Sequence, residues 1–319
     1  MEAKRRMTTV LLAGALALLA HASAEAQLTK MRVGTIPIID AAPLQAAVAK
    51  GYFAAEGIEI DFTAAVGAGG LPAVAAGHLQ SVLSNVISVI LGHDQGLGFQ
   101  MIAVASASSD APPNSSGLVA RKGSGIKTGR DLEGKRVAIN ARNNINWLLA
   151  REWAALTGGN PDKMTFLEVP FPNMGDALRG NQVDAAFVVE PFLSAGVAGG
   201  VTEVVDWPFD RFMKRVPIAQ YVTTKSYIEA NPALVERWVR AYNRGMDWIN
   251  QNKGSDEWVK LIAGYTRLTP EQIRDIALPL WDKTVDPAAV ARMASLMRKH
   301  GLLQRDVDVK DMLHKTVVK

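Results

Sequence analysis

One pattern occurs twice in this chain and constrains its fold more than any other feature. Residues 177–192 have the sequence ALRGNQVDAAFVVEPF, which reads as a helix end, a glycine turn, a buried strand and an acidic loop. Residues 71–85, LPAVAAGHLQSVLSN, follow the same order. With Gln80 aligned to Asp184 the copies lie about 104 residues apart, a domain-scale spacing. We therefore expect two α/β lobes whose polar loops, at the carboxyl ends of strands, face a cleft.

The rest of the chain extends this alternation of strands and helices. The sequence predicts strands at 31–36, 58–62, 81–83, 100–105, 117–121, 136–140, 164–169, 184–189 and 217–224. It predicts helices at 44–56, 71–76, 146–156 and 175–179, and mostly helix after residue 232. Such alternation is typical of an α/β fold with a mainly parallel sheet in each lobe, flanked by helices.

Two strands are expected to connect the lobes. The strand at 117–121 leaves the first lobe, and the strand at 217–224 returns to it. We expect lobe 1 to comprise 27–118 with 220–319, and lobe 2 to comprise 119–219. The two crossings form a two-stranded hinge, and hinge closure is an established ligand-binding motion.

Composition excludes several classes of protein. The hydrophobic fraction is 48% and the charged fraction 21%, which is ordinary for a globular protein. A net charge of +4 without a basic run beyond Arg6 argues against nucleic-acid binding. The absence of cysteine excludes disulfides and thiolate zinc sites. The histidines are scattered, so neither a metal nor a cofactor is expected.

Residues 1–26 have the features of a secretory signal peptide. Lys4, Arg5 and Arg6 precede an apolar run of 11 residues at 10–20, and small residues offer cleavage after Ala24 or Ala26. An uncleaved anchor is the alternative, but the run is too short to span a bilayer. No later stretch reaches 18 apolar residues, so we expect a soluble, periplasmic protein.

Several motifs together resemble the substrate-binding proteins of nitrate, sulfonate and taurine-type ABC importers, a group that also contains thiamine-pyrimidine-precursor binders. The matching segments are Val33-Gly34 followed by Pro37 and Pro43, the run 49–60 (AKGYFAAEGIEI), and 177–178 with 183–185 and 190–191. They cover nearly the whole mature chain. The resemblance implies a two-lobed periplasmic binding fold, type II-like, that passes a small solute to a permease and its ATPase. We expect the protein to act as a monomer.

The chain departs from this pattern in three places. Gln80 stands where the first-lobe repeat usually has Asp, and Asn181 stands where the second-lobe turn usually has Gly. The loop 143–146 lacks the expected glycine and serine turns. The ligand therefore does not carry over from the better-known members.

Two predicted helix starts could bind an anion. Gly69 and Gly70 end a glycine-rich turn whose free N–H groups could clasp a carboxylate or sulfonate, although an ordinary strand-to-helix turn is equally plausible. At the second start, Arg142 could pair with an anion and Trp147 could stack on a flat ligand, or they could face solvent and the core respectively. The remaining candidates in this segment are Asn140 and Asn144, which could cap the helix and reach a ligand.

Other candidates follow predicted strands. Pro37, Ile38 and Asp40 follow the first strand, and Asp40 could instead cap the next helix. Further polar candidates at strand ends are Ser84, Asn85, Asn173 and Glu190. Glu190 would repel an anion unless the ligand carries a hydrogen-bond donor, and it could instead be a helix cap or hinge contact.

The function expected from these features is a non-enzymatic receptor. Its ligand would be a small organic anion, either a sulfonate or an aromatic or aliphatic carboxylate. The alternatives are a neutral pyrimidine-type or other small solute, and an enzyme of the pyrimidine-precursor type. The enzyme is disfavoured because the chain has neither a GxSxG motif nor a cysteine nucleophile.

Overall fold

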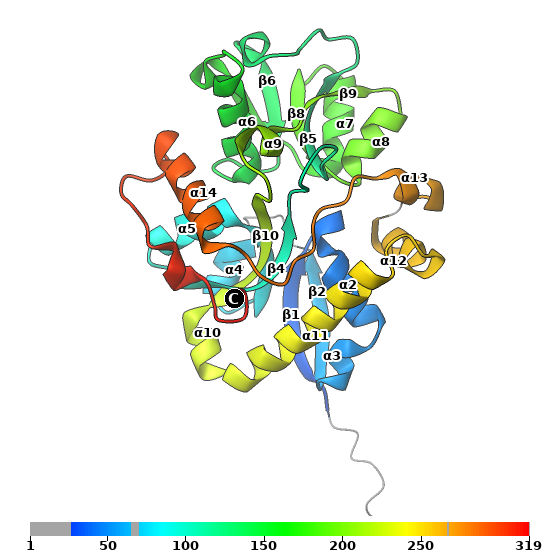
Figure 1. Cartoon of the computed structure of the whole chain (residues 1–319), viewed down its shortest axis with the longest axis vertical. Helices are drawn as coiled ribbons and strands as arrows, with labels where there is room; N and C mark the ends of the chain where they lie inside the picture. The colour runs from blue at the N-terminus through cyan, green and yellow to red at the C-terminus, as the bar shows by residue number, and fades with distance from the viewer. Residues whose placement is uncertain (1–26, 65–69, 267, 319) are drawn as a thin grey trace, which may run out of the picture.

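The computed structural model describes residues 27–64, 70–266 and 268–318. It contains two five-stranded sheets, each forming the centre of one lobe (Figure 1). The proposed signal peptide, Gly69 and most of the glycine-rich turn lie outside the described residues.

The first sheet has the strand order β2-β1-β3-β10-β4. Its strands are β1 (Thr29–Thr35), β2 (Ile58–Ala64), β3 (Ser81–Asn85), β4 (Phe99–Ala107) and β10 (Pro217–Thr224). β1 pairs in parallel with β2 and β3, whereas β10 lies antiparallel between β3 and β4. The returning strand β10 is therefore an inner strand of the sheet and is antiparallel to both of its neighbours.

The second sheet repeats this plan with the order β7-β6-β8-β5-β9. Its strands are β5 (Ser116–Arg121), β6 (Arg136–Ile139), β7 (Thr165–Glu168), β8 (Ala185–Val189) and β9 (Thr202–Asp206). β6 is parallel to β7 and β8, while β5 is antiparallel to β8 and β9. In each sheet one strand, β10 in the first and β5 in the second, runs antiparallel to both of its neighbours.

Helices cover the faces of both sheets (Figure 1). Those of the first lobe are η1 (Ile39–Ala41), α2 (Ala42–Ala49), α3 (Tyr52–Ala55), α4 (Leu71–Ala75), α5 (Val86–Asp94), α10 (Lys225–Ala230), α11 (Pro232–Gln251), α12 (Asp256–Thr266), α13 (Pro270–Asp275), α14 (Pro287–Lys299) and η5 (Val309–Met312). Those of the second lobe are η3 (Gly129–Leu132), α6 (Ile145–Leu156), η4 (Pro161–Lys163), α7 (Phe171–Arg179), α8 (Phe192–Ala198) and α9 (Pro208–Phe212).

Two details differ from the sequence expectations. The helix predicted at 44–56 is broken at Gly51, whose φ of +71° ends α2 and starts α3. Helix α5 and strand β9 were not predicted. The expected lobe boundaries at 118/119 and 219/220 lie within β5 and β10, and this division of the chain stays a prediction.

A third segment lies beside the two connecting chains. Ala107 and Leu280 exchange two backbone hydrogen bonds of 3.0 and 2.9 Å, and Ser108 N donates to Val216 O over 2.9 Å. Arg215 adds ion pairs to Asp110 and Asp282. The segment around Leu280 is thus bonded to the two connecting chains, and the two-stranded hinge stays a prediction. In the part of the chain described, no helix is long and apolar enough to cross a membrane.

Candidate functional site

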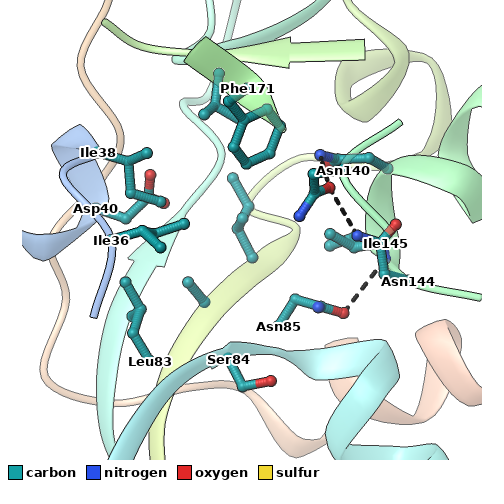
Figure 2. A pocket seen from close by; sticks show the side chains of 14 residues that line it. Ile36, Ile38, Asp40, Leu83, Ser84, Asn85, Asn140, Asn144, Ile145 and Phe171 are labelled. Carbon is teal, nitrogen blue, oxygen red and sulfur yellow. Dashed lines mark hydrogen bonds between the residues drawn. The ribbon is translucent and has the colours of Figure 1, made fainter. Parts of the chain in front are cut away.

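A cavity lies between the lobes at the carboxyl ends of the strands. It is lined by Ile36, Ile38, Asp40, Leu83, Ser84, Asn85, Ile218 and Ala219 from the first lobe and by Asn140, Asn144, Ile145, Asn146, Phe171 and Val189 from the second (Figure 2). An adjoining space of about 160 Å³ is lined by Pro37, Pro170, Pro172 and Phe192 in addition to shared residues. That volume is close to the ~150 Å³ that holds a benzene molecule in an engineered cavity.

Asn85 and Asn144 hold the two helix starts that face the cavity. Asn85 Oδ1 accepts from Ser88 N over 3.1 Å and caps α5, and Asn144 Oδ1 accepts from Trp147 N over 3.0 Å and caps α6. Asn85 Oδ1 also accepts from Ile145 N of the other lobe over 3.2 Å. The capping that the sequence suggested for Asn144 therefore exists, and a matching cap exists at Asn85.

The asparagine amides form a small network on the second-lobe side. Asn140 Oδ1 accepts from Asn144 Nδ2 over 2.8 Å and from Asn146 Nδ2 over 3.1 Å. Because both bonds use the oxygen of Asn140, its amide nitrogen is left to donate into the cavity. Figure 2 shows Asn140 and Asn144 on one side of the space and Asp40 with Ile36 and Ile38 on the other.

Asp40 is the buried carboxyl of the site. Asp40 is 2% exposed, and its side chain accepts a hydrogen bond from the Ser106 hydroxyl. Burial raises the pKa of Asp40, and the bond from Ser106 opposes this only in part. Asp40 is the central residue of η1, which immediately precedes α2.

The cavity lining contains no lysine, arginine or histidine among the described residues. Arg142 is exposed, donates its backbone N–H to Glu168 over 2.7 Å and directs its guanidinium to the carbonyl oxygen of Phe166. An ion pair between Arg142 and a ligand in this cavity would need a different side-chain direction, so that role stays a prediction.

Three other candidate residues lie away from the cavity lining. Trp147 is half-buried against Phe166, with ring centroids 5.9 Å apart, and the Arg151 guanidinium covers its ring. Asn173 is exposed, and Gly70 is the N-cap residue of α4. Their ligand-binding roles also stay predictions.

Glu190 is fully buried at the contact between the lobes. Its carboxylate accepts from Ser194 N over 3.1 Å and from Ser194 Oγ over 2.6 Å, and its carbonyl oxygen accepts from Ile39 N over 3.2 Å. Burial raises the pKa of Glu190, and the Ser194 bonds oppose this. These contacts match the alternative of a helix cap or hinge contact more closely than a ligand-binding role.

Sequence reasoning missed most of the apolar lining. Ile36, Leu83, Val189 and Ile218 lie in or beside strand ends whose loops were recognised, but buried apolar residues resemble ordinary core positions. Phe171 was the clearest available signal, because it stands between two prolines just before the candidate Asn173. Phe171 lines the cavity whereas Asn173 is exposed. The two residues are close in the chain, and they differ in the direction of their side chains.

The comparison with known families decides what kind of protein carries this cavity. Residues 38–254, more than half of the chain, match the family described as NMT1/THI5 like. The chain belongs to the NMT1/THI5-like family. This result confirms the family resemblance drawn from the motifs.

Relatives of this NMT1/THI5-like chain are named for binding nitrate or sulfonates. A nitrate/nitrite binding protein NrtA of Nostoc sp. (strain PCC 7120) is 27% identical over 256 residues, which is 74% of this chain and 57% of the relative. The chain therefore spans little more than half the length of that relative.

Solved structures confirm the fold. The alkanesulfonate-binding protein SsuA from Xanthomonas axonopodis pv. citri, bound to MOPS, gives a TM-score of 0.76 at 17% identity, covering 90% of this chain and 99% of that one. The periplasmic nitrate-binding protein NrtA from Synechocystis PCC 6803 gives 0.73 at 17% identity, covering 89% and 84%. The two-lobed α/β binding-protein fold expected from the sequence is confirmed, and at these identities the likeness shows the fold alone. Within the described ranges, no three His, Asp or Glu residues are placed to hold a metal ion.

Proposed function

We propose that this NMT1/THI5-like chain is the periplasmic solute-binding receptor of an ABC importer, and that it captures a small organic anion between its lobes without chemical conversion. The observation that supports this most is the position of the cavity, where the strand ends of both sheets meet. The closed lobes would present a surface to the permease and its ATPase. Names of the relatives support the receptor role.

The proposed anion is held by neutral donors. The starts of α5 and α6 point at the cavity, and helix N-termini favour negative charge. The amide nitrogen of Asn140 supplies a further donor. With no basic side chain among the described lining residues, a singly charged carboxylate or sulfonate suits the site better than a multiply charged ion.

The apolar lining favours an organic solute over an inorganic ion. Phe171, Ile38 and Phe192 line the space of about 160 Å³, which is large enough for an aliphatic or aromatic body. Burying such a body contributes roughly 25 cal/mol per Å² of apolar surface removed from water. Nitrate has no apolar surface to contribute.

A specific observation keeps a second ligand class open. Asp40 lies in the lining opposite the asparagine amides (Figure 2) and can accept a hydrogen bond from a ligand. A neutral, pyrimidine-type solute with an amino group would satisfy Asp40 without placing a negative charge in a cavity that has no cation among its described residues.

A thermal-shift series tests the proposal. The probes are benzoate, benzenesulfonate, butanesulfonate, nitrate and an aminopyrimidine, each added to the purified mature protein. Binding stabilises by about 2.7 kcal/mol at a hundredfold excess over the dissociation constant. A shift with the organic anions that is lost in Asn140→Ala and kept in Arg142→Ala supports the proposed site.

Other outcomes contradict parts of the proposal. A shift with the aminopyrimidine alone, abolished in Asp40→Asn, replaces the anion with the second ligand class. A shift with nitrate but none of the organic anions contradicts the role of the apolar lining. Conversion of any probe, followed by mass spectrometry, contradicts a purely binding role.

A further inference from the structure

A charge cluster with a buried carboxylate and a buried imidazole joins the two lobes outside the cavity. Lys299 Nζ lies 2.8 Å from Glu152 Oε1 and 2.7 Å from Oε2, and His300 Nε2 lies 2.8 Å from Glu152 Oε2. Both oxygens of one carboxylate are therefore bonded to consecutive residues at the end of α14. We call these three residues the clasp.

The members of the clasp belong to different lobes. Glu152 lies on α6, which packs against α9, η3 and η4 of the second lobe. Lys299 is the last residue of α14, which packs against α5 and η5 of the first lobe (Figure 1). Rotation of one lobe away from the other would separate the carboxylate from its partners.

Burial makes this separation consequential. The side chains of Glu152 and His300 are 6% and 5% exposed, whereas the side chain of Lys299 is 54% exposed. A buried carboxylate is tolerated because it is paired and hydrogen-bonded, and removing one partner of such a pair is strongly destabilising. The exposed salt bridges within each lobe, such as Lys163 with Glu133, carry no comparable constraint.

We propose that Glu152, Lys299 and His300 form an interlobe clasp that favours the closed arrangement at neutral pH and is released by acidification. The cluster lies outside the cavity lining, so the clasp would regulate the proposed receptor without contacting its solute. The inference rests on the two-lobed structure and not on the identity of the ligand.

The direction of the pH effect follows from the surroundings of His300. Burial lowers the pKa of His300 in the closed form, Glu152 acts to raise it, and the charges of Arg151 on α6 and Lys299 on α14 lower it further. Asp162 on η4 also faces this group and is paired with Arg151. The open form binds the proton more readily, so pH falling through the ordinary imidazole range favours opening.

Protonation of Glu152 also favours opening of the lobes. Burial alone would raise the pKa of Glu152, but the hydrogen bonds from Lys299 and His300 outweigh burial and the net pKa is below the ordinary value. Its contribution to closure is complete above the ordinary carboxyl pKa and is lost as pH falls through the lowered value. Both titrations therefore weaken the clasp as the solution becomes acidic.

Two backbone amides report closure directly. Ile145 N donates to Asn85 Oδ1 and Ile39 N donates to the Glu190 carbonyl oxygen, each across the lobe boundary. Their hydrogen exchange, followed by NMR on the full mature chain without added solute, measures opening. Trp147 N serves as the internal reference, because its acceptor Asn144 lies in the same lobe.

The test compares Glu152→Gln and His300→Gln with the control Glu56→Gln, which removes the Glu56–Arg240 pair within the first lobe. At pH 7.5 we expect Glu152→Gln to lower the protection factors of Ile39 and Ile145 by about tenfold or more, with Trp147 unchanged. In wild type the same two factors should fall between pH 7.5 and 5.5, and His300→Gln should flatten that fall. Unchanged factors in Glu152→Gln, or an equal loss at Trp147, would overturn the clasp.

Discussion

The side-chain oxygen of Asn85 accepts from two backbone N–H groups that belong to different lobes. Ser88 N is the donor within its own helix, and Ile145 N is the donor from α6. The first N–H groups of a helix have no intrahelical acceptor, so Asn85 satisfies a group in each lobe only while the lobes are closed. Asn85 therefore couples the stability of α5 to closure of the two lobes.

Replacing Asn85 by alanine should therefore have two effects. We expect unfolding free energy to fall by about 2 kcal/mol, because a helix cap and a partner for a buried N–H are both lost. Affinity for whichever solute the thermal-shift series identifies should fall as well. Thr224→Ala is the matched control, because Thr224 caps α10 within one lobe. It should cost about 1 kcal/mol and leave affinity intact; an equal loss of affinity in both variants would contradict the interlobe role.

Asp40 gives a pH-dependent prediction. Because the folded-state pKa of Asp40 is raised, the folded chain binds this proton more tightly than the unfolded chain. Its contribution to stability is therefore greatest below the unfolded pKa of about 4 and is lost as pH rises through the folded value. Urea denaturation of Asp40→Asn should show a stability gain over wild type that grows between pH 4 and neutrality. A difference that stays constant with pH would contradict burial of an ionisable carboxyl here.

At the scale of elements, the sequence predicts the repeated strands and misses helix α5, whose apolar run could be either helix or strand. All strands of both sheets except β9 are recognisable, because short apolar runs alternate with glycine turns. α5 was missed because its start, VISVIL, is β-branched and apolar, and periodicity cannot separate such a run from a buried strand. For the site, strand ends identified Asp40, Asn85, Asn140 and Asn144, but the outward course of Arg142 depends on packing with β7.

The contact between α11 and α2 depends on one glycine. A Cβ at Gly245 would lie 2.3 Å from Pro43 O and 2.7 Å from Ala47 Cβ. Gly245→Ala should therefore destabilise by roughly 1–3 kcal/mol, as overpacking does. Gly264→Ala on α12 meets nothing within 4 Å and should stabilise by roughly 0.5–1 kcal/mol. Thermal denaturation measures both, and equal effects would contradict the close approach.

At the scale of the molecule, the lobes differ in how the chain builds them. All five strands of the second sheet, β5 to β9, come from one uninterrupted stretch, whereas the first sheet needs β10 from beyond the second lobe. β10 separates β3 from β4, so without it both strands have an unpaired edge. Unpaired edges invite association with other chains.

This difference predicts the behaviour of fragments. A fragment of residues 113–215 should fold alone, with dispersed amide signals in its NMR spectrum and a cooperative thermal transition. A fragment of residues 27–112, which has four strands but not β10, should stay unfolded or aggregate. A well-dispersed spectrum from the second fragment would contradict the role assigned to β10 in completing the first lobe.

The segment bonded beside the two connecting chains has a mechanical consequence. Two connecting strands alone leave the lobes free both to bend and to twist about the line that joins them. The segment bonded to Ala107 through Leu280 adds an attachment on the first-lobe side, and the Arg215 ion pairs brace the returning chain against it. We expect twisting, which slides the connecting chains past one another, to strain these bonds more than bending does. We therefore expect the lobes to open and close by bending about a single axis with little twist. The same residues of the two lobes would then face each other each time the cavity closes.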